Sequence, residues 1–167
     1  MGTRPTADRL RETLFNILSF KVRGAVVLDL FAGTGALGIE AISRGAERAV
    51  FIDRDRGAVA VIRENTGDLG IADQARVIRW DAAKGLACIR DHAPRFDMVF
   101  MDPPYDRGFI LPALAALRES GSLAEDAEVI VEHTPKEALP EEIPGFRVAD
   151  RRLYGKTAVT FLSLGEG

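Results

Sequence analysis

Residues 25–38 read Ala-Val-Val-Leu-Asp-Leu-Phe-Ala-Gly-Thr-Gly-Ala-Leu-Gly, and this stretch decides the fold of the chain. Residues 25–30 form a mostly apolar run, which is typical of a parallel strand buried on both faces. Residues 31–35 supply the glycines of a turn, and residues 36–43 continue as a helix that ends at Gly45. The stretch therefore predicts a strand, a turn and a helix, the repeating unit of an α/β domain.

The same alternation of strand and helix continues along the chain. Because strand and helix alternate, a mostly parallel sheet with helices on both faces follows. Two closing strand-like runs are joined by Tyr154-Gly155-Lys156, which predicts an antiparallel hairpin. We predict a single doubly wound, Rossmann-like α/β domain over residues 1–167. The further strands are predicted at 48–52, 75–79, 96–101, 128–132, 146–153 and 157–164, and the other helices at 7–18, 57–69, 82–91 and 109–119.

The composition is that of an ordinary globular protein of one domain. The 167 residues are 47% hydrophobic and 28% charged. No apolar run approaches the length of a membrane span and no charged-then-apolar leader opens the sequence, so we expect a cytoplasmic protein without a membrane segment. The single cysteine, Cys88, excludes an internal disulfide, and its helical pattern predicts a small buried hydrophobic residue. His92 and His133 are too scattered to indicate a metal centre.

The charge is unevenly distributed along the chain. A net charge of −3 argues against a protein that coats nucleic acid nonspecifically. Two basic patches nevertheless lie near the chain ends, and they either meet in space and face phosphates or form ordinary solvated surface. They comprise Arg4, Arg9, Arg11, Lys21 and Arg23 in the first, and Arg151, Arg152 and Lys156 in the second.

Acidic residues stand at the carboxyl ends of successive predicted strands. Ligands of doubly wound sheets bind at these ends, near the point where the strand order reverses. Asp29, Asp53, Asp81 and Asp102 occupy them. Carboxylates suit a ligand with hydroxyls and a cationic group better than one with phosphates.

The glycine turn allows two interpretations. Residues 33–38 spell G-x-G-x-x-G between a strand and a helix, and Asp53 follows about twenty residues later, so a nicotinamide dinucleotide is one candidate ligand. S-adenosylmethionine is the other. Gly33 and Gly35 would allow its close approach, Asp53 would meet the ribose hydroxyls, Asp29 a cationic amino group and Asp81 the adenine amine. The structural alternatives are a turn for Asp53 and a helix N-cap for Asp81.

Asp102-Pro103-Pro104-Tyr105 directly follows the apolar run 98–101. The prolines fix φ and remove two backbone donors, so the chain leaves the sheet in a stiff, extended loop. The Asp102 carboxylate and the Pro103 carbonyl then form a pair of acceptors, and Tyr105 offers a flat face. This arrangement predicts a receptor for a planar group with an exocyclic NH2. The alternative is a proline-rich turn in which Asp102 is a local cap.

Two sets of motifs carry a resemblance to a known family. Residues 29–35 together with Asp102–Tyr105 resemble the class I methyltransferases that act on amino nitrogens. The motifs around the helix at 7–18 and the hairpin are similar to those of the RsmD-type bacterial ribosomal RNA guanine-N2 methyltransferases, and the resemblance covers essentially the whole chain. These motifs are Arg4-Pro5-Thr6, Arg9-Leu10-Arg11-Glu12, Leu14-Phe15-Asn16 and Tyr154-Gly155-Lys156-Thr157.

The resemblance implies a class I fold with S-adenosylmethionine as cofactor. It implies methyl transfer to the exocyclic N2 of one guanine in small-subunit (16S) ribosomal RNA, within a ribosomal particle, by a monomer without a metal. Adenine N6 or another amine is the alternative target, and a nicotinamide-dependent oxidoreductase the alternative class. Family members carry a further glycine- and arginine-rich segment before Arg4, so we expect any difference to affect RNA affinity and not cofactor binding.

The residue roles implied by the resemblance fall into three groups. Asp102 and the Pro103 carbonyl would orient the amine, and Tyr105 would stack on a flipped or unpaired base. Surface charge and a helix-end hydrogen bond are the alternatives for Arg11 and Asn16. The groups are catalytic (Asp102, Pro103, Pro104, Tyr105), cofactor-binding (Asp29, Phe31, Ala32, Gly33, Thr34, Gly35, Asp53, Arg54, Asp81, Ala82) and RNA-binding (Arg4, Thr6, Arg11, Asn16, Lys156).

Overall fold

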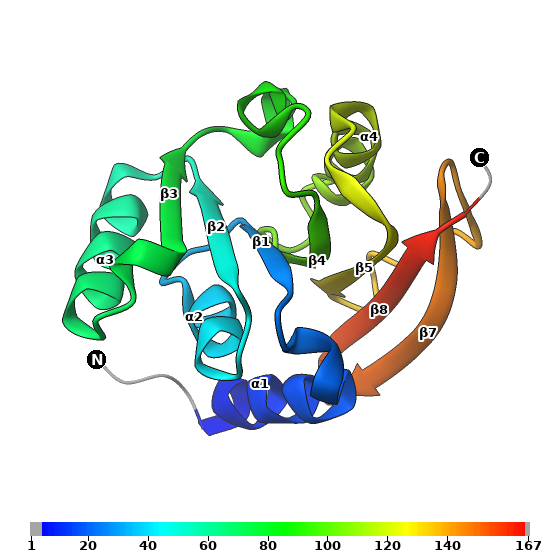
Figure 1. Cartoon of the computed structure of the whole chain (residues 1–167). Helices are drawn as coiled ribbons and strands as arrows, with labels where there is room; N and C mark the ends of the chain where they lie inside the picture. Colours follow the sequence, from blue (N-terminus) through cyan, green and yellow to red (C-terminus); the bar gives the residue numbers. More distant parts are fainter. Residues whose placement is uncertain (1–4, 166–167) are drawn as a thin grey trace.

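A single sheet of eight strands organises the chain in the computed structural model, which describes residues 5–165, with side chains from Ala7 onward (Figure 1). The strands are β1 Val26–Leu30, β2 Arg48–Asp53, β3 Ala75–Arg79, β4 Phe96–Met101, β5 Leu123–His133, β6 Glu142–Ile143, β7 Phe146–Tyr154 and β8 Thr157–Leu164. The α-helices are α1 Pro5–Leu18, α2 Ala36–Ser43, α3 Arg56–Asp68 and α4 Ile110–Ser120. Short 3-10 turns lie at η1 Ser19–Val22, η2 Ala72–Gln74, η3 Ala82–Lys84 and η4 Ala87–Ile89.

The strand order is β3-β2-β1-β4-β5-β8-β7-β6. Strands β1 to β5 run parallel to their neighbours, while β8 is antiparallel to both β5 and β7. The mostly parallel sheet and its C-terminal antiparallel hairpin are therefore confirmed. The chain builds β2 and β3 on one side of β1 and β4 on the other, so the order reverses between β1 and β4. Ligands of doubly wound sheets bind at the carboxyl ends beside such a reversal.

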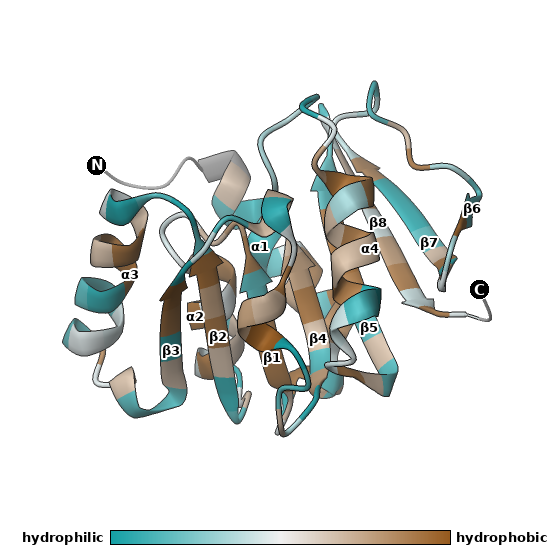
Figure 2. Cartoon of the chain, turned by 90° about the horizontal axis from the view of Figure 1, so that it is seen from above, coloured by the Kyte–Doolittle hydropathy of each residue, from teal (hydrophilic) through white to brown (hydrophobic). Residues whose placement is uncertain are grey.

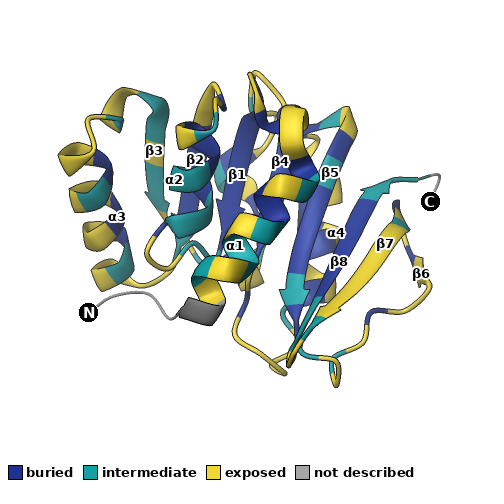
Figure 3. Cartoon of the chain, turned by 90° about the horizontal axis from the view of Figure 1, so that it is seen from below, coloured by how far each residue is buried: buried dark blue, intermediate teal, exposed yellow. Residues whose placement is uncertain are grey.

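Helices cover both faces of the sheet, as the alternating pattern predicts. On one face α4 and the turns η3 and η4 pack against the strands, with Leu114, Leu117 and Ile89 fully or almost fully buried (Figure 2). On the other face lie α1, α2 and α3, which contribute Phe15 and Ile62 to the second core cluster (Figure 3). The central strands are buried from both sides, which explains their unbroken apolar runs.

The last glycine of the G-x-G-x-x-G motif serves the packing of α2 on β2. A Cβ built on Gly38 would lie 2.3 Å from the ring atom Cε1 of Phe51, which is fully buried. The Gly38 N–H donates to Asp29 Oδ2 at 3.0 Å, which fixes the helix start against β1. A side chain at position 38 would therefore displace either the Phe51 ring or the helix.

Gly38→Ala is expected to lower the free energy of unfolding by about 1–3 kcal/mol, because it overpacks the contact between α2 and β2. Urea unfolding monitored by circular dichroism measures the loss. Gly67→Ala in α3 is the matched control, since a Cβ there meets nothing within 4 Å. Alanine favours a helix more than glycine does, so the control should be neutral or slightly stabilised. Equal losses in both variants would contradict the packing argument.

The predicted helix over residues 82–91 is wrong. The segment forms the separate turns η3 and η4, because Gly85 between them adopts φ 102° and ψ −178°, a conformation that ends the first turn. Leu86 and Ile89 still reach the core, so the apolar spacing was real although the helix was not. Cys88 lies in η4, where it is half-buried against that core cluster.

Two other differences concern the far side of the sheet. Strand β5 begins at Leu123 instead of residue 128, and β6 was not predicted at all. Across the described residues, none of the helices combines the length and the apolar character that crossing a bilayer demands. Within the same residues, no three His, Cys, Asp or Glu side chains are grouped so that they could hold a metal ion.

Candidate active site

A cavity of about 440 Å³ opens at the carboxyl ends of the parallel strands, where the strand order reverses. Its volume is in the range of small-molecule sites, and its wall combines aromatic side chains with three carboxylates. The lining residues are Phe31, Ile52, Asp53, Arg54, Trp80, Asp81, Ala82, Ala83, Asp102, Pro103, Pro104, Tyr105 and Phe109.

Most of the predicted catalytic and cofactor residues meet in this cavity. All four residues of the Asp102–Tyr105 motif line it, together with Phe31, Asp53 and Arg54. The predicted residues Asp81 and Ala82 line it as well. The remaining predicted cofactor residues are absent from the lining and stand behind it, namely Asp29, Ala32, Gly33, Thr34 and Gly35.

Asp29 is almost completely buried, with 1% of its surface exposed. Its carboxyl accepts the Gly38 N–H, and burial raises its pKa to about 8, while nearby Asp102 and Asp53 add to the rise. The structure therefore places Asp29 as a buried support of the glycine turn, and not at the cavity surface.

Asp53 joins the glycine turn to the end of β2. Its Oδ2 accepts the Gly33 N–H at 2.9 Å, and its Oδ1 accepts the Asp55 N–H at 2.9 Å. Each carboxylate oxygen has more than one lone pair, so both can accept a further hydrogen bond from a ligand hydroxyl in the cavity. One side chain thus shapes the turn and offers acceptors to a ligand.

Asp81 and Trp80 form the wall that follows β3. Asp81 Oδ1 accepts the Ala83 N–H at 3.0 Å, so it caps the turn η3 as the structural alternative requires, while it also lines the cavity. Trp80 Nε1 donates to the Gly85 carbonyl at 3.0 Å, which fixes the indole in the wall. The sequence analysis did not select Trp80 or Phe109. Phe109 stacks on Phe31 with ring centroids 6.2 Å apart.

Asp102 and Glu132 are neighbours on adjacent strands. Met101 of β4 pairs with Val131 of β5, so the next residue of each strand lies beside the other, and the two carboxyl groups hydrogen bond. Asp102 opens to the cavity, yet the surrounding protein limits its hydration and raises its pKa to about 6. Burial, followed by the charge of Asp102, raises the pKa of Glu132 to about 8. At neutral pH the pair therefore holds one proton, on Glu132, which donates to the Asp102 carboxylate.

Glu132 was missed although it carries the same signal as Asp102. An acidic residue follows the apolar run 129–131, as Asp102 follows the run 98–101. Only the sheet order shows that these two strand ends are adjacent.

The proton on Glu132 makes the stability of the fold depend on pH. The folded chain keeps this proton up to about pH 8, whereas an unfolded chain releases it near 4.5, so between these values the unfolded state binds fewer protons. The free energy of unfolding should therefore fall as pH rises through this window, by up to about 1.4 kcal/mol per pH unit. Urea unfolding at pH 5, 6.5 and 8 measures the slope. Glu132→Gln should flatten it, whereas Glu141→Gln at an exposed position should not. An unchanged slope in Glu132→Gln would contradict the assignment.

Tyr105 is 42% exposed and stands at the cavity rim. It hydrogen bonds with the Thr157 side chain at the start of β8, and burial raises its pKa. The loop after β4 and the C-terminal hairpin therefore meet beside the cavity. Lys156 lies in the turn of this hairpin and is exposed at the same edge of the sheet.

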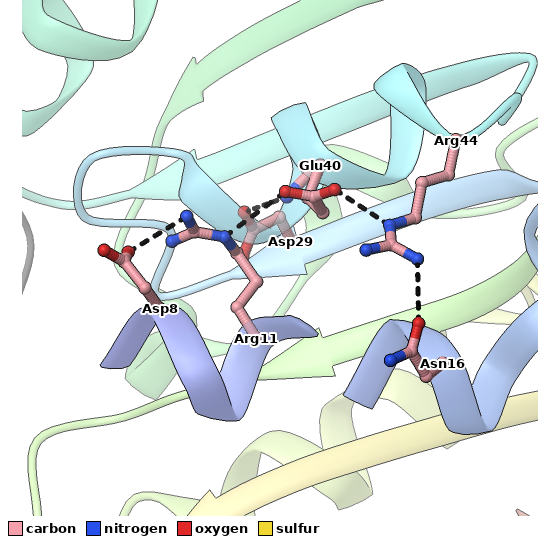
Figure 4. Close-up of polar contacts among 7 residues, drawn as sticks. Asp8, Arg11, Asn16, Asp29, Glu40 and Arg44 are labelled. Carbon is pink, nitrogen blue, oxygen red and sulfur yellow. Dashed lines mark hydrogen bonds and ion pairs between the residues drawn. The ribbon is translucent and has the colours of Figure 1, made fainter. Parts of the chain in front are cut away.

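The structure gives Arg11 and Asn16 partners on α2 and its end, away from the cavity lining (Figure 4). Arg11 pairs with Asp8 at 3.1 Å and with Glu40 at 3.4 Å. Asn16 accepts a hydrogen bond from Arg44 at 3.4 Å. These contacts tie α1 to α2.

The other predicted RNA-binding residues divide into those that the structure describes and those that it does not. Arg4 and the side chain of Thr6 lie outside the described part of the chain. In the second basic patch, Arg151 pairs with Glu141 at 3.4 Å and Arg152 with Asp150 at 2.9 Å. Lys156 makes no ion pair with any side chain of residues 7–165.

Comparisons with known proteins agree with this site. The family model described as "Conserved hypothetical protein 95" matches residues 1–163. "Putative rRNA methyltransferase YlbH" of Bacillus subtilis is 37% identical over 158 residues, which cover 95% of this chain and 86% of the relative. "Ribosomal RNA small subunit methyltransferase D" of Escherichia coli K12 is 38% identical over 157 residues, which cover 94% and 77%.

A solved structure extends the agreement to the fold. The "putative methyltransferase yhhF" of Escherichia coli superposes with a TM-score of 0.82 at 34% identity, over 99% of this chain and 90% of that one. The strand order and the C-terminal hairpin are thus those of a class I methyltransferase. The chain belongs to the Conserved hypothetical protein 95 family, the RsmD-type methyltransferases that its sequence motifs resemble.

Proposed function

We propose that this chain transfers a methyl group from S-adenosylmethionine to the exocyclic N2 amine of a guanine in small-subunit ribosomal RNA. One observation carries the proposal: Asp53, Asp81 and the Asp102–Tyr105 motif line a single cavity at the point where the strand order reverses. The names of the two relatives support ribosomal RNA as the substrate class. The two-acceptor loop beside an aromatic face supports a planar amine as the target.

The residues of the β1, β2 and β3 ends fit the cofactor. Asp53 would accept hydrogen bonds from the ribose hydroxyls and Asp81 from the adenine amine, with Phe31 and Trp80 as apolar walls for the base. The glycine turn gives the chain close approach to the ligand, and Gly33 is held in place by Asp53. When bound, S-adenosylmethionine supplies an electrophilic methyl group on a sulfonium sulfur.

The loop after β4 would present the amine. The guanine N2 lone pair is delocalised into the ring, so the amine is a poor nucleophile until its geometry changes. Asp102 and the Pro103 carbonyl would accept its two N–H bonds and turn the lone pair toward the methyl group, so positioning supplies much of the rate. Glu132 keeps its proton at neutral pH and donates to Asp102, which holds that carboxylate in place.

Tyr105 would stack on the guanine ring. A guanine inside a stem cannot reach the cavity, so the base must be flipped out or already unpaired. Arg4, Thr6, Arg11, Asn16 and Lys156 remain the proposed RNA contacts, and Lys156 is the member exposed at the cavity edge. The same proposal takes the enzyme as a single-domain, cytoplasmic monomer that needs no metal and acts on a ribosomal particle.

Methyl transfer from tritiated S-adenosylmethionine to small ribosomal subunits tests the proposal, with subunits from cells that lack this enzyme. The RNA is digested after the reaction and the labelled nucleoside identified by chromatography. We expect the label in N2-methylguanosine. Label in N6-methyladenosine would keep the reaction and overturn the target. Absence of transfer, with binding of nicotinamide dinucleotide instead of S-adenosylmethionine, would overturn the reaction.

A further inference from the structure

The loop that carries the Asp102–Tyr105 motif into α4 has a left-handed backbone immediately after Tyr105. Asp106 adopts φ 57° and Gly108 φ 69°. Positive φ is strained for a residue other than glycine and persists where surrounding contacts enforce it. The contacts that enforce it here come from the segment after β5, which the sequence analysis did not single out.

A single carboxylate holds two backbone N–H groups of this loop. Glu137 Oε1 accepts the Asp106 N–H at 2.9 Å, and Glu137 Oε2 accepts the Gly108 N–H at 3.2 Å. Hydrogen bonds to a charged acceptor are the strong class, and two of them to one group fix its orientation. Glu137 is thus a two-pronged clamp across the backbone on the far side of Tyr105.

Thr134 adds a third contact and fixes the clamp itself. Its Oγ1 donates to Asp106 Oδ1 at 2.5 Å, and it accepts the Glu137 N–H at 3.3 Å. The Glu137 N–H also donates to the Thr134 carbonyl at 3.1 Å. Both residues lie in the turn that follows His133, the last residue of β5, so a strand of the sheet anchors them.

We propose that Glu137, assisted by Thr134, is a positioning residue that holds the loop so that Tyr105 and the Pro103 carbonyl face the target base. The inference rests on the proposed function. Glu137 is absent from the cavity lining and therefore acts through the loop. The loop belongs to the amine side of the cavity, whereas Asp53 and Asp81 on β2 and after β3 do not contact it, so the clamp should affect the target base and not the cofactor.

The contacts make a definite prediction about which kinetic quantity changes. Without the carboxylate, Asp106 is free to leave its left-handed conformation, and Tyr105 moves with it. Small misplacements of a positioned group cost large factors in rate. Glu137→Ala should therefore lower kcat/KM for the RNA about tenfold and leave the Kd for S-adenosylmethionine within about twofold.

Three variants test the clamp. Glu137→Ala removes it, Glu137→Gln keeps one carbonyl acceptor and should restore part of the activity, and Glu141→Ala is the charge-matched control. Glu141 lies in the same connecting segment, with 91% of its side chain exposed, and contacts only Arg151. Methyl transfer, cofactor binding by calorimetry and amide hydrogen exchange are measured for each. The Asp106 and Gly108 amides should exchange about tenfold faster in Glu137→Ala and unchanged in Glu141→Ala.

Several results would overturn the inference. Unchanged exchange of the two amides in Glu137→Ala would mean that no clamp exists, and faster exchange with a normal rate would mean that it positions nothing. An equal loss of cofactor affinity would indicate general damage to the fold. If the wild-type chain methylates no RNA, the proposed function fails and with it the positioning role, while the exchange rates still show whether Glu137 holds the loop.

Discussion

Replacing Asp102 with alanine is expected to reduce the rate of methyl transfer about 100- to 1,000-fold while leaving the affinity for S-adenosylmethionine within about twofold. Asp102 is the acceptor at the end of β4, held by the hydrogen bond with Glu132 on the neighbouring strand. Loss of one preorganised group that acts on the developing charge typically costs factors of this size. The cofactor residues stand on other strands, so they keep their geometry.

The rate is measured with small ribosomal subunits at saturating S-adenosylmethionine, and the affinity by calorimetry. Asp126→Ala is the control, because Asp126 is an exposed acid of β5 near the strand start and is absent from the cavity lining. Asp102→Asn should fall between, since the amide keeps one acceptor oxygen in the same place. Full activity in Asp102→Ala would show that the amine is not oriented by this carboxylate.

The sequence predicts the elements of the sheet because each buried parallel strand is an apolar run that ends at a turn signal. The run 96–101 and the strand β4 coincide, as do the run 75–79 and β3. The helix predicted at 82–91 failed for a local reason. Its apolar residues do face the core, but Gly85 lets the chain satisfy them with two short turns.

Side-chain partners were less accessible to sequence analysis, because they depend on which elements become neighbours. Glu132 became part of the site only through the register of β5 beside β4. Arg11 lies on α1 with the charge expected of an RNA contact, yet its partner Glu40 comes from α2. The polarity of a helix face cannot distinguish these cases, since both place a cation at the surface.

Asp53→Ala is expected to have the opposite signature: a Kd for S-adenosylmethionine about 10- to 100-fold higher, with the rate at saturating cofactor changed little. The substitution removes the proposed acceptor for the ribose hydroxyls and also releases the Gly33 N–H from its 2.9 Å hydrogen bond. Hydrogen bonds to a charged group contribute about 1.5–3 kcal/mol each, which corresponds to this range of affinity. Calorimetric titration of S-adenosylmethionine measures the change.

Asp53→Asn separates the two roles of the carboxylate, because its carbonyl oxygen can still accept the Gly33 N–H and so preserve the turn. A large loss in both variants would assign the effect to ligand hydroxyls, and a loss confined to alanine would assign it to the turn. Because an acid at this position also suits a dinucleotide ribose, NAD is titrated in parallel. Wild-type affinity for S-adenosylmethionine in Asp53→Ala would remove β2 from the cofactor side of the cavity. Loss of NAD binding instead would favour the oxidoreductase, since the same carboxylate would then serve a different ligand.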